Sequence, residues 1–313
     1  MRSTNLFPRG KAGGYFALGI TSVVWGTTWV ASKVGVSEMP PLQMASIRQF
    51  LGGFCFLAYF IFYKGMSLPT RRQLGWLVVM AILMFVFANG LSTWSLLYIP
   101  TGLSSLIGAL YPLSVVIIER VFYKNRNMNL LTFAGLILGI VGIGIVFYES
   151  AFASQPKGFF LGLVLSVLAM LSWSVGTIFI ARNKLKINPY YGTGWQMLIS
   201  SGILYIVAYG TQPMIPLSAM TIKAWLVITY LVLGGSLLSF IAFIYSMKKL
   251  PAAISSLYAY FNPLVAMITA ALFLNERLTM NILWGALVTL AGVFLVNYSI
   301  KQAKKKLLAG SEQ

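Results

Sequence analysis

The sequence lacks the residue types from which most catalytic and metal sites are built. It has no histidine and no aspartate among 313 residues, and only five acidic residues. Its one cysteine, Cys55, lies in an apolar run and has no second cysteine with which to form a disulfide. No glycine-rich loop ending in lysine is present to hold a phosphate. We therefore expect no metal site, no cofactor and no enzymatic activity.

Charge of either sign is also scarce. Only 9% of the residues are charged and 58% are hydrophobic, with a mean hydropathy of +0.83. Soluble domains carry about 25% charged residues, so this composition predicts an integral membrane protein. A net charge of +18 is typical of nucleic-acid binders. Here the basic residues sit in short segments between apolar runs, which favours orientation in a lipid bilayer and no nucleic-acid partner.

Long charge-free runs predict the membrane-spanning helices, because a helix needs about 20 apolar residues to cross the bilayer core. An all-α protein with ten transmembrane helices is expected. The runs that hold them are 12–32, 41–63, 73–118 (two helices divided at 97–101), 127–148, 158–181, 187–222, 224–247, 250–275 and 278–300. Only Arg48 interrupts the second of these runs.

The basic residues are divided unevenly between the two sides that ten spans create. With the N-terminus inside, eighteen Lys and Arg residues fall in cytoplasmic segments and four fall in external segments. Such a positive-inside bias sets membrane orientation. It predicts a multi-pass protein of the inner (plasma) membrane with both termini in the cytoplasm.

One phrase occurs twice in the chain. PTGLSSLIGALYPL at 100–113 and PAAISSLYAYFNPL at 251–264 share six of fourteen positions and lie 151 residues apart. The copies open the fourth and the ninth predicted helices, so each repeat is five helices long. Because five is odd, the second copy enters the membrane from the opposite side. We therefore expect two inverted repeats, 12–148 and 158–300, with a binding site between them near the midplane.

Two longer stretches resemble a known family. WGTTWVASKVGVSEMPPLQMASIRQFLGG at 25–53 and FNPLVAMITAALFLNERLTMNILWGALVTLAGVFLV at 261–296 are similar to the EamA family of the drug/metabolite transporter superfamily. The resemblance covers nearly the whole chain. It implies a ten-helix bundle with both termini inside and the export of metabolites or amino acids.

One departure from the family pattern concerns a glutamate. The family's Pro…Glu-Arg ending is present in the second half as Pro263, Glu276 and Arg277. In the first half, Asn125 stands where the glutamate is expected, and Glu119 lies six residues earlier.

Two charged residues lie within predicted spans. Glu119, near the cytoplasmic end of its span, is either part of an interfacial ion pair or a snorkelling carboxylate, or else a site for a substrate amine or a proton facing the inner vestibule. Arg48 lies about 10 Å into the second span. It either braces the bundle or contacts a substrate carboxylate. Energy coupling would use Glu119, a substrate gradient or the membrane potential.

Two prolines occupy matching places half-way along the fourth and ninth spans. Pro112 and Pro263 each remove a backbone hydrogen bond and free the carbonyls of Gly108 and Ala259. They are either static kinks or paired hinges beside a central cavity. Two glycine pairs, Gly135-x-x-x-Gly139 and Gly234-Gly235, are interpreted as close helix contacts.

Polar and aromatic side chains in the middle of several spans suit a neutral or amphipathic ligand. They either line a cavity or pack the bundle. The predicted substrate-binding residues are Trp25, Thr28, Asn89, Trp94, Ser105, Tyr111, Trp173, Ser239, Tyr258 and Asn262.

The sequence thus predicts a secondary transporter that exports small amphipathic metabolites, with amino acids favoured, by alternating access through a central cavity. A lipid scramblase or a membrane enzyme using the same cavity is the alternative. The oligomeric state, the coupling ion and the substrate itself do not follow from the sequence.

Overall fold

The computed structural model describes residues 10–123, 130–152, 157–182, 185–250, 254 and 257–310. Within these ranges every regular element is a helix. Asn125 and part of the second repeated phrase fall outside the described residues.

The helices of the first half follow one another through short connections. They are α1 (Gly10–Glu38), α2 (Pro41–Ala58), the π-helix η1 (Tyr59–Tyr63), α3 (Arg71–Ala81), the π-helix η2 (Ile82–Leu91), α4 (Ser92–Ser95), α5 (Thr101–Ala109), α6 (Tyr111–Tyr123) and α7 (Leu130–Phe152). The second half contains α8 (Phe159–Arg182), α9 (Pro189–Thr211), the 3-10 helix η3 (Leu217–Ala219), α10 (Ile222–Tyr230), the π-helix η4 (Leu231–Leu238), α11 (Ser239–Lys249), α13 (Tyr258–Leu274) and α14 (Met280–Gly310).

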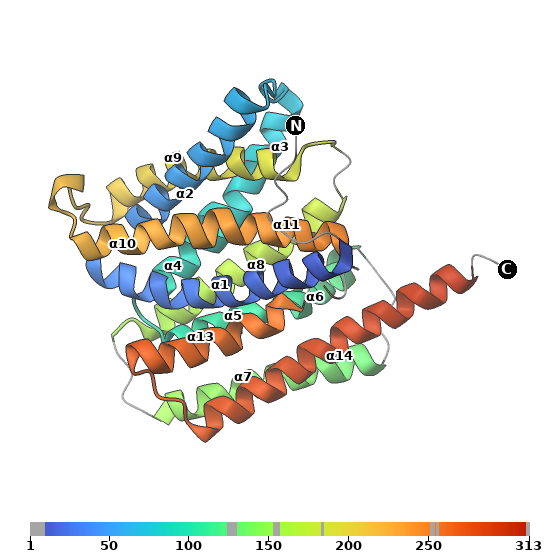
Figure 1. Ribbon diagram of the computed structural model, residues 1–313. Helices are drawn as coiled ribbons and strands as arrows, with labels where there is room; N and C mark the ends of the chain where they lie inside the picture. The colour runs from blue at the N-terminus through green and yellow to red at the C-terminus, as the bar shows by residue number, and fades with distance from the viewer. Residues whose placement is uncertain are drawn as a thin grey trace.

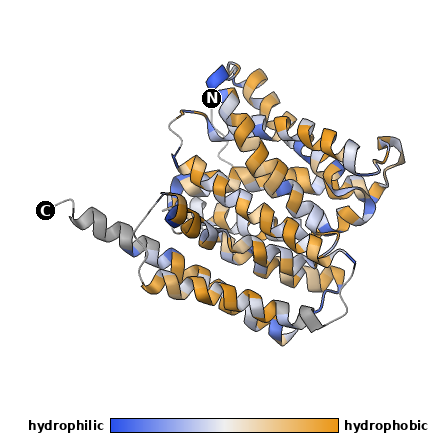
Figure 2. Ribbon diagram, turned by 180° about the vertical axis from the view of Figure 1, so that it is seen from behind, coloured by the Kyte–Doolittle hydropathy of each residue, from blue (hydrophilic) through white to orange (hydrophobic). Residues whose placement is uncertain are grey.

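Six helical segments of the described chain are long and apolar enough to cross a membrane. They are Pro41–Tyr63, Arg71–Ser95, Thr101–Tyr123, Phe159–Arg182, Ile222–Lys249 and Met280–Ser299. Figure 2 shows hydrophobic residues along the lengths of the helices and hydrophilic residues mainly at helix ends and loops. The predicted all-α membrane fold is confirmed at this level.

The helices form a bundle in which α7 and α14 lie together along one flank (Figure 1). On the opposite flank, α2 packs against α9. Between these flanks, α1 contacts α11 and α13, while α8 contacts η2 and α5. The start of α1 and the end of α14 lie at the same end of the bundle.

Glycines allow α7 and α14 to approach closely. A Cβ at Gly135 would lie 2.7 Å from the carbonyl oxygen of Gly292, and a Cβ at Gly292 would lie 2.4 Å from the backbone nitrogen of Gly139. Small residues of this kind let membrane helices pack backbone to backbone. The predicted close contact at Gly135 and Gly139 is thus present, and its partner is Gly292.

Side chains before several helices explain where those helices begin. Thr70 accepts a hydrogen bond from the Gln73 backbone nitrogen, and the Gln73 side chain accepts one from the Thr70 nitrogen. This reciprocal capping box satisfies two backbone donors at the start of α3. Asn188 at the start of α9 and Thr221 at the start of α10 also accept hydrogen bonds from backbone nitrogens, without the reciprocal bond.

The repeated prolines differ in their effect on the helix. A break at Leu110 separates α5 from α6, and Pro112 follows as the second residue of α6. Pro263 instead lies inside an unbroken α13. Proline fits the first turn of a helix, where its missing N–H is not needed. The first proline thus accompanies a change of helix, whereas the second is contained within one.

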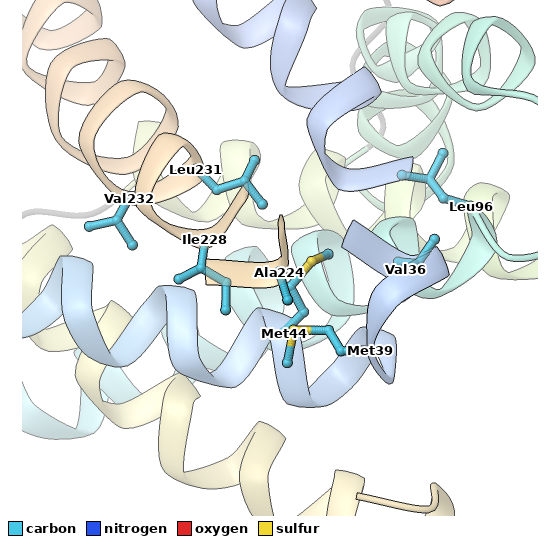
Figure 3. Close-up of a cluster of buried hydrophobic side chains, with 8 residues drawn as sticks. All are labelled: Val36, Met39, Met44, Leu96, Ala224, Ile228, Leu231 and Val232. Atoms are coloured by element: carbon cyan, nitrogen blue, oxygen red, sulfur yellow. The ribbon is translucent and has the colours of Figure 1, made fainter. Parts of the chain in front are cut away.

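A cluster of buried apolar side chains fixes one end of the bundle (Figure 3). Its members come from the end of α1, the turn after it, the start of α2, the residue after α4, and α10 with η4. They include two methionines, Met39 and Met44. Gly35 makes this packing possible, because a Cβ there would lie 2.2 Å from the Met44 sulfur. Leu96, also in the cluster, lines the central cavity as well, so the cluster supports the cavity wall.

Candidate functional site

A cavity of about 200 Å³ lies among α1, α2, η2, α5, α8 and α13. Eight of the ten predicted binding residues line it: Trp25, Thr28, Asn89, Ser105, Tyr111, Trp173, Tyr258 and Asn262. Arg48 and Pro263 line it as well. Side chains separated by up to 238 residues in the chain therefore meet at one place.

Four predicted residues lie outside this lining. Trp94 packs against the buried cluster that contains Leu42 and Leu204. Ser239 is fully buried in α11. Pro112 is buried in the first turn of α6, beside the lining residue Tyr111. Trp94 and Ser239 were predicted to bind substrate and Pro112 to act as a hinge, and none of the three is part of the cavity lining.

Glu119, the fourth of these residues, lies at the periphery of the bundle. Its side chain is 33% exposed, and Oε1 lies 3.6 Å from Nη2 of Arg182 at the end of α8. The Arg182 guanidinium in turn lies 3.5 Å from the centre of the Tyr123 ring. This geometry corresponds to the ion-pair alternative of the sequence analysis, with α6 and α8 joined across their ends.

Arg48 is the charged residue of the cavity. Only 8% of it is exposed, and Nε donates a hydrogen bond of 3.1 Å to the Ser236 hydroxyl in η4. The neighbouring Gly235 leaves room for it, because a Cβ there would lie 2.9 Å from Arg48 Nη2. The Gly235 carbonyl accepts a hydrogen bond from Trp25 Nε1 at 3.0 Å. The widened turns of η4 thus hold both side chains.

Aromatic rings form one wall of the cavity. The Trp25 ring centre lies 5.1 Å from that of Phe240 and 5.3 Å from that of Tyr258, which both line the cavity. It lies 5.2 Å from that of Phe243, which packs behind the lining. Phe243 and Tyr258 also stack edge to face, with centres 5.2 Å apart. Such packed rings present a large apolar surface of fixed shape, suited to the apolar part of a ligand.

Amide groups provide the polar counterpart. Gln49 Nε2 donates to Asn89 Oδ1 at 2.9 Å, which joins α2 to η2. Within the described part of the chain, Gln49 Oε1 and Asn262 Oδ1 are buried without a hydrogen-bond partner. Buried polar groups normally have partners. These two oxygens are therefore available to accept hydrogen bonds from a ligand.

Sequence reasoning missed several lining residues, including Gln49, Trp29 and Ser104. Gln49 could have been found, since an amide next to an arginine inside a span is costly unless it is used. Ser104 has a structural explanation, because its hydroxyl lies 3.1 Å from that of Ser95 and 3.2 Å from that of Ser166. No comparable signal marked Trp29.

Known proteins resemble this chain over almost its full length. The profile of the EamA-like transporter family matches residues 12–148 and 160–298. The uncharacterized transporter YoaV of Bacillus subtilis is 27% identical, with 92% of this chain and 98% of that protein covered. The uncharacterized inner membrane transporter YedA of Escherichia coli is 28% identical, with 92% and 89% covered.

Two further matches extend this picture. Protein PecM of Dickeya dadantii is 28% identical, with 91% of this chain and 92% of that protein covered. A crystal structure superposes with a TM-score of 0.63 at 15% identity, covering 90% of this chain and 96% of the other. At that identity the superposition shows a shared fold alone.

Proposed function

Since this chain belongs to the EamA-like transporter family, we propose that it is a secondary transporter for small amphipathic metabolites, with amino acids as the favoured class. The observation that carries this proposal is the cavity, which joins an aromatic wall to amides, hydroxyls and one guanidinium. Pockets that hold drug-sized ligands measure about 300–1,000 Å³. A cavity of about 200 Å³ fits a smaller molecule.

The proposed architecture is ten membrane helices in two inverted repeats, 12–148 and 158–300. Helix contacts support it, because they pair equivalent positions of the two halves. α2 packs against α9, and α7 packs against α14. The contact of α1 with α13 has its counterpart in the contact of α8 with α5. The π-helices η2 and η4 interrupt the third and eighth predicted spans in the same way.

We propose that transport proceeds by alternating access, with the repeats rocking about the cavity. The break at Leu110, followed by Pro112, and Pro263 in the lining would act as hinges. We propose that the protein lies in the inner membrane with both termini in the cytoplasm. The start of α1 and the end of α14 lie at the same end of the bundle, which supports a common side for the termini. Net flux is outwards in this proposal, and it is driven by the substrate gradient or the membrane potential. Glu119 serves in the peripheral ion pair and not in coupling.

The test is efflux from proteoliposomes loaded with a panel of radiolabelled amino acids. Transport should depend on the protein and should fall when Gly108 in the lining is replaced by Phe, which fills the cavity. Gly144→Phe in α7 is the matched control, because a Cβ there meets nothing within 4 Å. Equal flux in the two variants would contradict transport through this cavity.

The same vesicles distinguish the alternatives. Fluorescent lipid placed in one leaflet should not change sides faster than in protein-free vesicles. Rapid lipid movement without solute efflux would indicate that the protein is a scramblase and not a transporter. Chemical conversion of the panel compounds in the absence of efflux would indicate a membrane enzyme.

A further inference from the structure

Arg48 carries a positive charge at a buried position in a helix long and apolar enough to span the membrane. Charged side chains in such positions cost several kcal/mol unless they are paired or face a cavity. Among the side chains that the structure describes, no carboxylate lies within ion-pair distance of Arg48. Its Nε donates to Ser236, and within the described part of the chain the two terminal nitrogens have no protein acceptor.

The acidic side chains that the structure describes are all engaged elsewhere. Glu38 pairs with Lys223, and Glu119 pairs with Arg182. Glu276 accepts hydrogen bonds from the backbone at the start of α5. No acidic residue belongs to the described lining of the cavity. Among its described lining residues, the cavity therefore has a single positive charge, that of Arg48, and no countercharge.

Resting on the transport function proposed above, we propose that Arg48 is the anion-binding residue of this cavity and that the transported metabolite bears a carboxylate. A guanidinium presents parallel N–H groups that match the two oxygens of a carboxylate. Ser236, by accepting from Nε, fixes the side chain and leaves the terminal nitrogens directed to a ligand. The carboxylate would supply the missing countercharge.

The single charge favours a carboxylate over a phosphate monoester. A phosphate monoester carries close to two negative charges at neutral pH, and one guanidinium would compensate only half of them. The aromatic wall around Trp25 then receives the apolar body of the molecule. Gln49 Oε1 and Asn262 Oδ1 remain to accept from a donor group such as an ammonium. The cavity can thus accommodate an amino group on the ligand, whereas binding requires a carboxylate.

Matched ligand pairs test this requirement on the purified full-length protein in detergent. One pair is 3-phenylpropionate and phenethylamine, and another is 4-methylpentanoate and isoamylamine, with phenylalanine and leucine as the parent compounds. A ligand that binds the folded protein raises its melting temperature. We expect the acids and the amino acids to raise it at millimolar concentration and the amines to leave it unchanged.

Variants locate the binding group. Arg48→Gln should weaken carboxylate binding by roughly tenfold or more, because the charge pair is lost. Arg48→Lys should retain part of the affinity, because it keeps the charge but not the two-pronged geometry. Arg182→Gln, which removes an arginine outside the cavity, is the control and should bind normally. If Arg48→Gln does not fold, the ligand pairs on the unaltered protein still decide the matter.

Amines that bind as well as acids, carboxylate binding unchanged in Arg48→Gln, or no shift with any acid would each overturn the inference. The outcome is separable from that of the proposed function. Efflux without preference for carboxylates would reject the anion site and retain the transporter. Carboxylate binding without efflux would retain the anion site and reject the transport function.

Discussion

The Glu276 carboxylate lies 2.8 Å from the backbone nitrogen of Thr101, although 175 residues separate them in the chain. Its second oxygen accepts from the Gly102 nitrogen at 3.2 Å. Pro100, at the N-cap of α5, offers no side-chain acceptor. Glu276, which follows α13, therefore caps a helix of the first half, where a negative charge also suits the helix dipole.

Replacing Glu276 by Gln should destabilise the protein. The amide offers a single acceptor and no charge, so at least one of the two capping hydrogen bonds is lost. The expected loss is about 1 kcal/mol in the free energy of unfolding, measured as a lower melting temperature in detergent. Glu38→Gln, which alters the ion pair between a half-buried Glu38 and the exposed Lys223, is the control. Equal melting temperatures for the two variants would argue against the cap.

Replacing Gly235 by Ala should disturb the cavity. The new methyl group would lie 2.8 Å from Thr28 Cγ2 and 2.9 Å from Arg48 Nη2, so both side chains must move. Overpacking of this kind costs about 1–3 kcal/mol, and efflux should fall with it. Gly202→Ala in α9 meets nothing within 4 Å and should behave as the unaltered protein. Unchanged efflux in Gly235→Ala would show that Arg48 has no fixed place.

Replacing Glu119 by Gln should change little. The ion pair with Arg182 is partly exposed and its atoms are 3.6 Å apart, and such surface pairs contribute about 0–1 kcal/mol. Efflux and ligand-induced melting shifts should match those of the unaltered protein. If efflux stops while the melting temperature is retained, Glu119 takes part in coupling and the peripheral assignment is wrong.

Replacing Pro112 by Ala should slow efflux and leave binding intact. Without the ring, α5 and α6 can join into one helix across Leu110, which removes the proposed hinge but no lining side chain. Efflux rates and ligand affinity should be measured together. Pro216→Ala, before η3, is the control. Loss of affinity in parallel with efflux would instead indicate a static role in shaping the cavity.

The fold could be predicted to the extent that it depends on the length of apolar runs. The runs containing Arg48 and Pro112 became helices because bilayer thickness sets their length. Side-chain direction was harder to predict. Trp94 and Ser239 resemble Trp25 and Ser105 in sequence context, yet only the latter pair line the cavity. Which side of a helix faces the cavity is decided by neighbouring helices, and a single span does not encode it.

The π-helices lay beyond prediction for a related reason. In a π-helix the backbone hydrogen bonds span one residue more than in an α-helix. In a span that is apolar on several sides, this shift does not change the hydrophobic pattern of the sequence. Asn89 and Ser236 lie in these segments, so their place in the lining depends on a backbone feature and not on spacing alone.

Because of the widened turns in η2 and η4, the orientation of the lining side chains depends on the number of residues in these segments. Each residue of a helix turns the chain by about 100°. Deleting one residue from η2 would rotate Ser92 and Thr93 by that angle relative to α3, away from the cavity that they line. Deletion in η4 would do the same to Phe240. Homologous chains can therefore exchange side chains here more readily than they can change length.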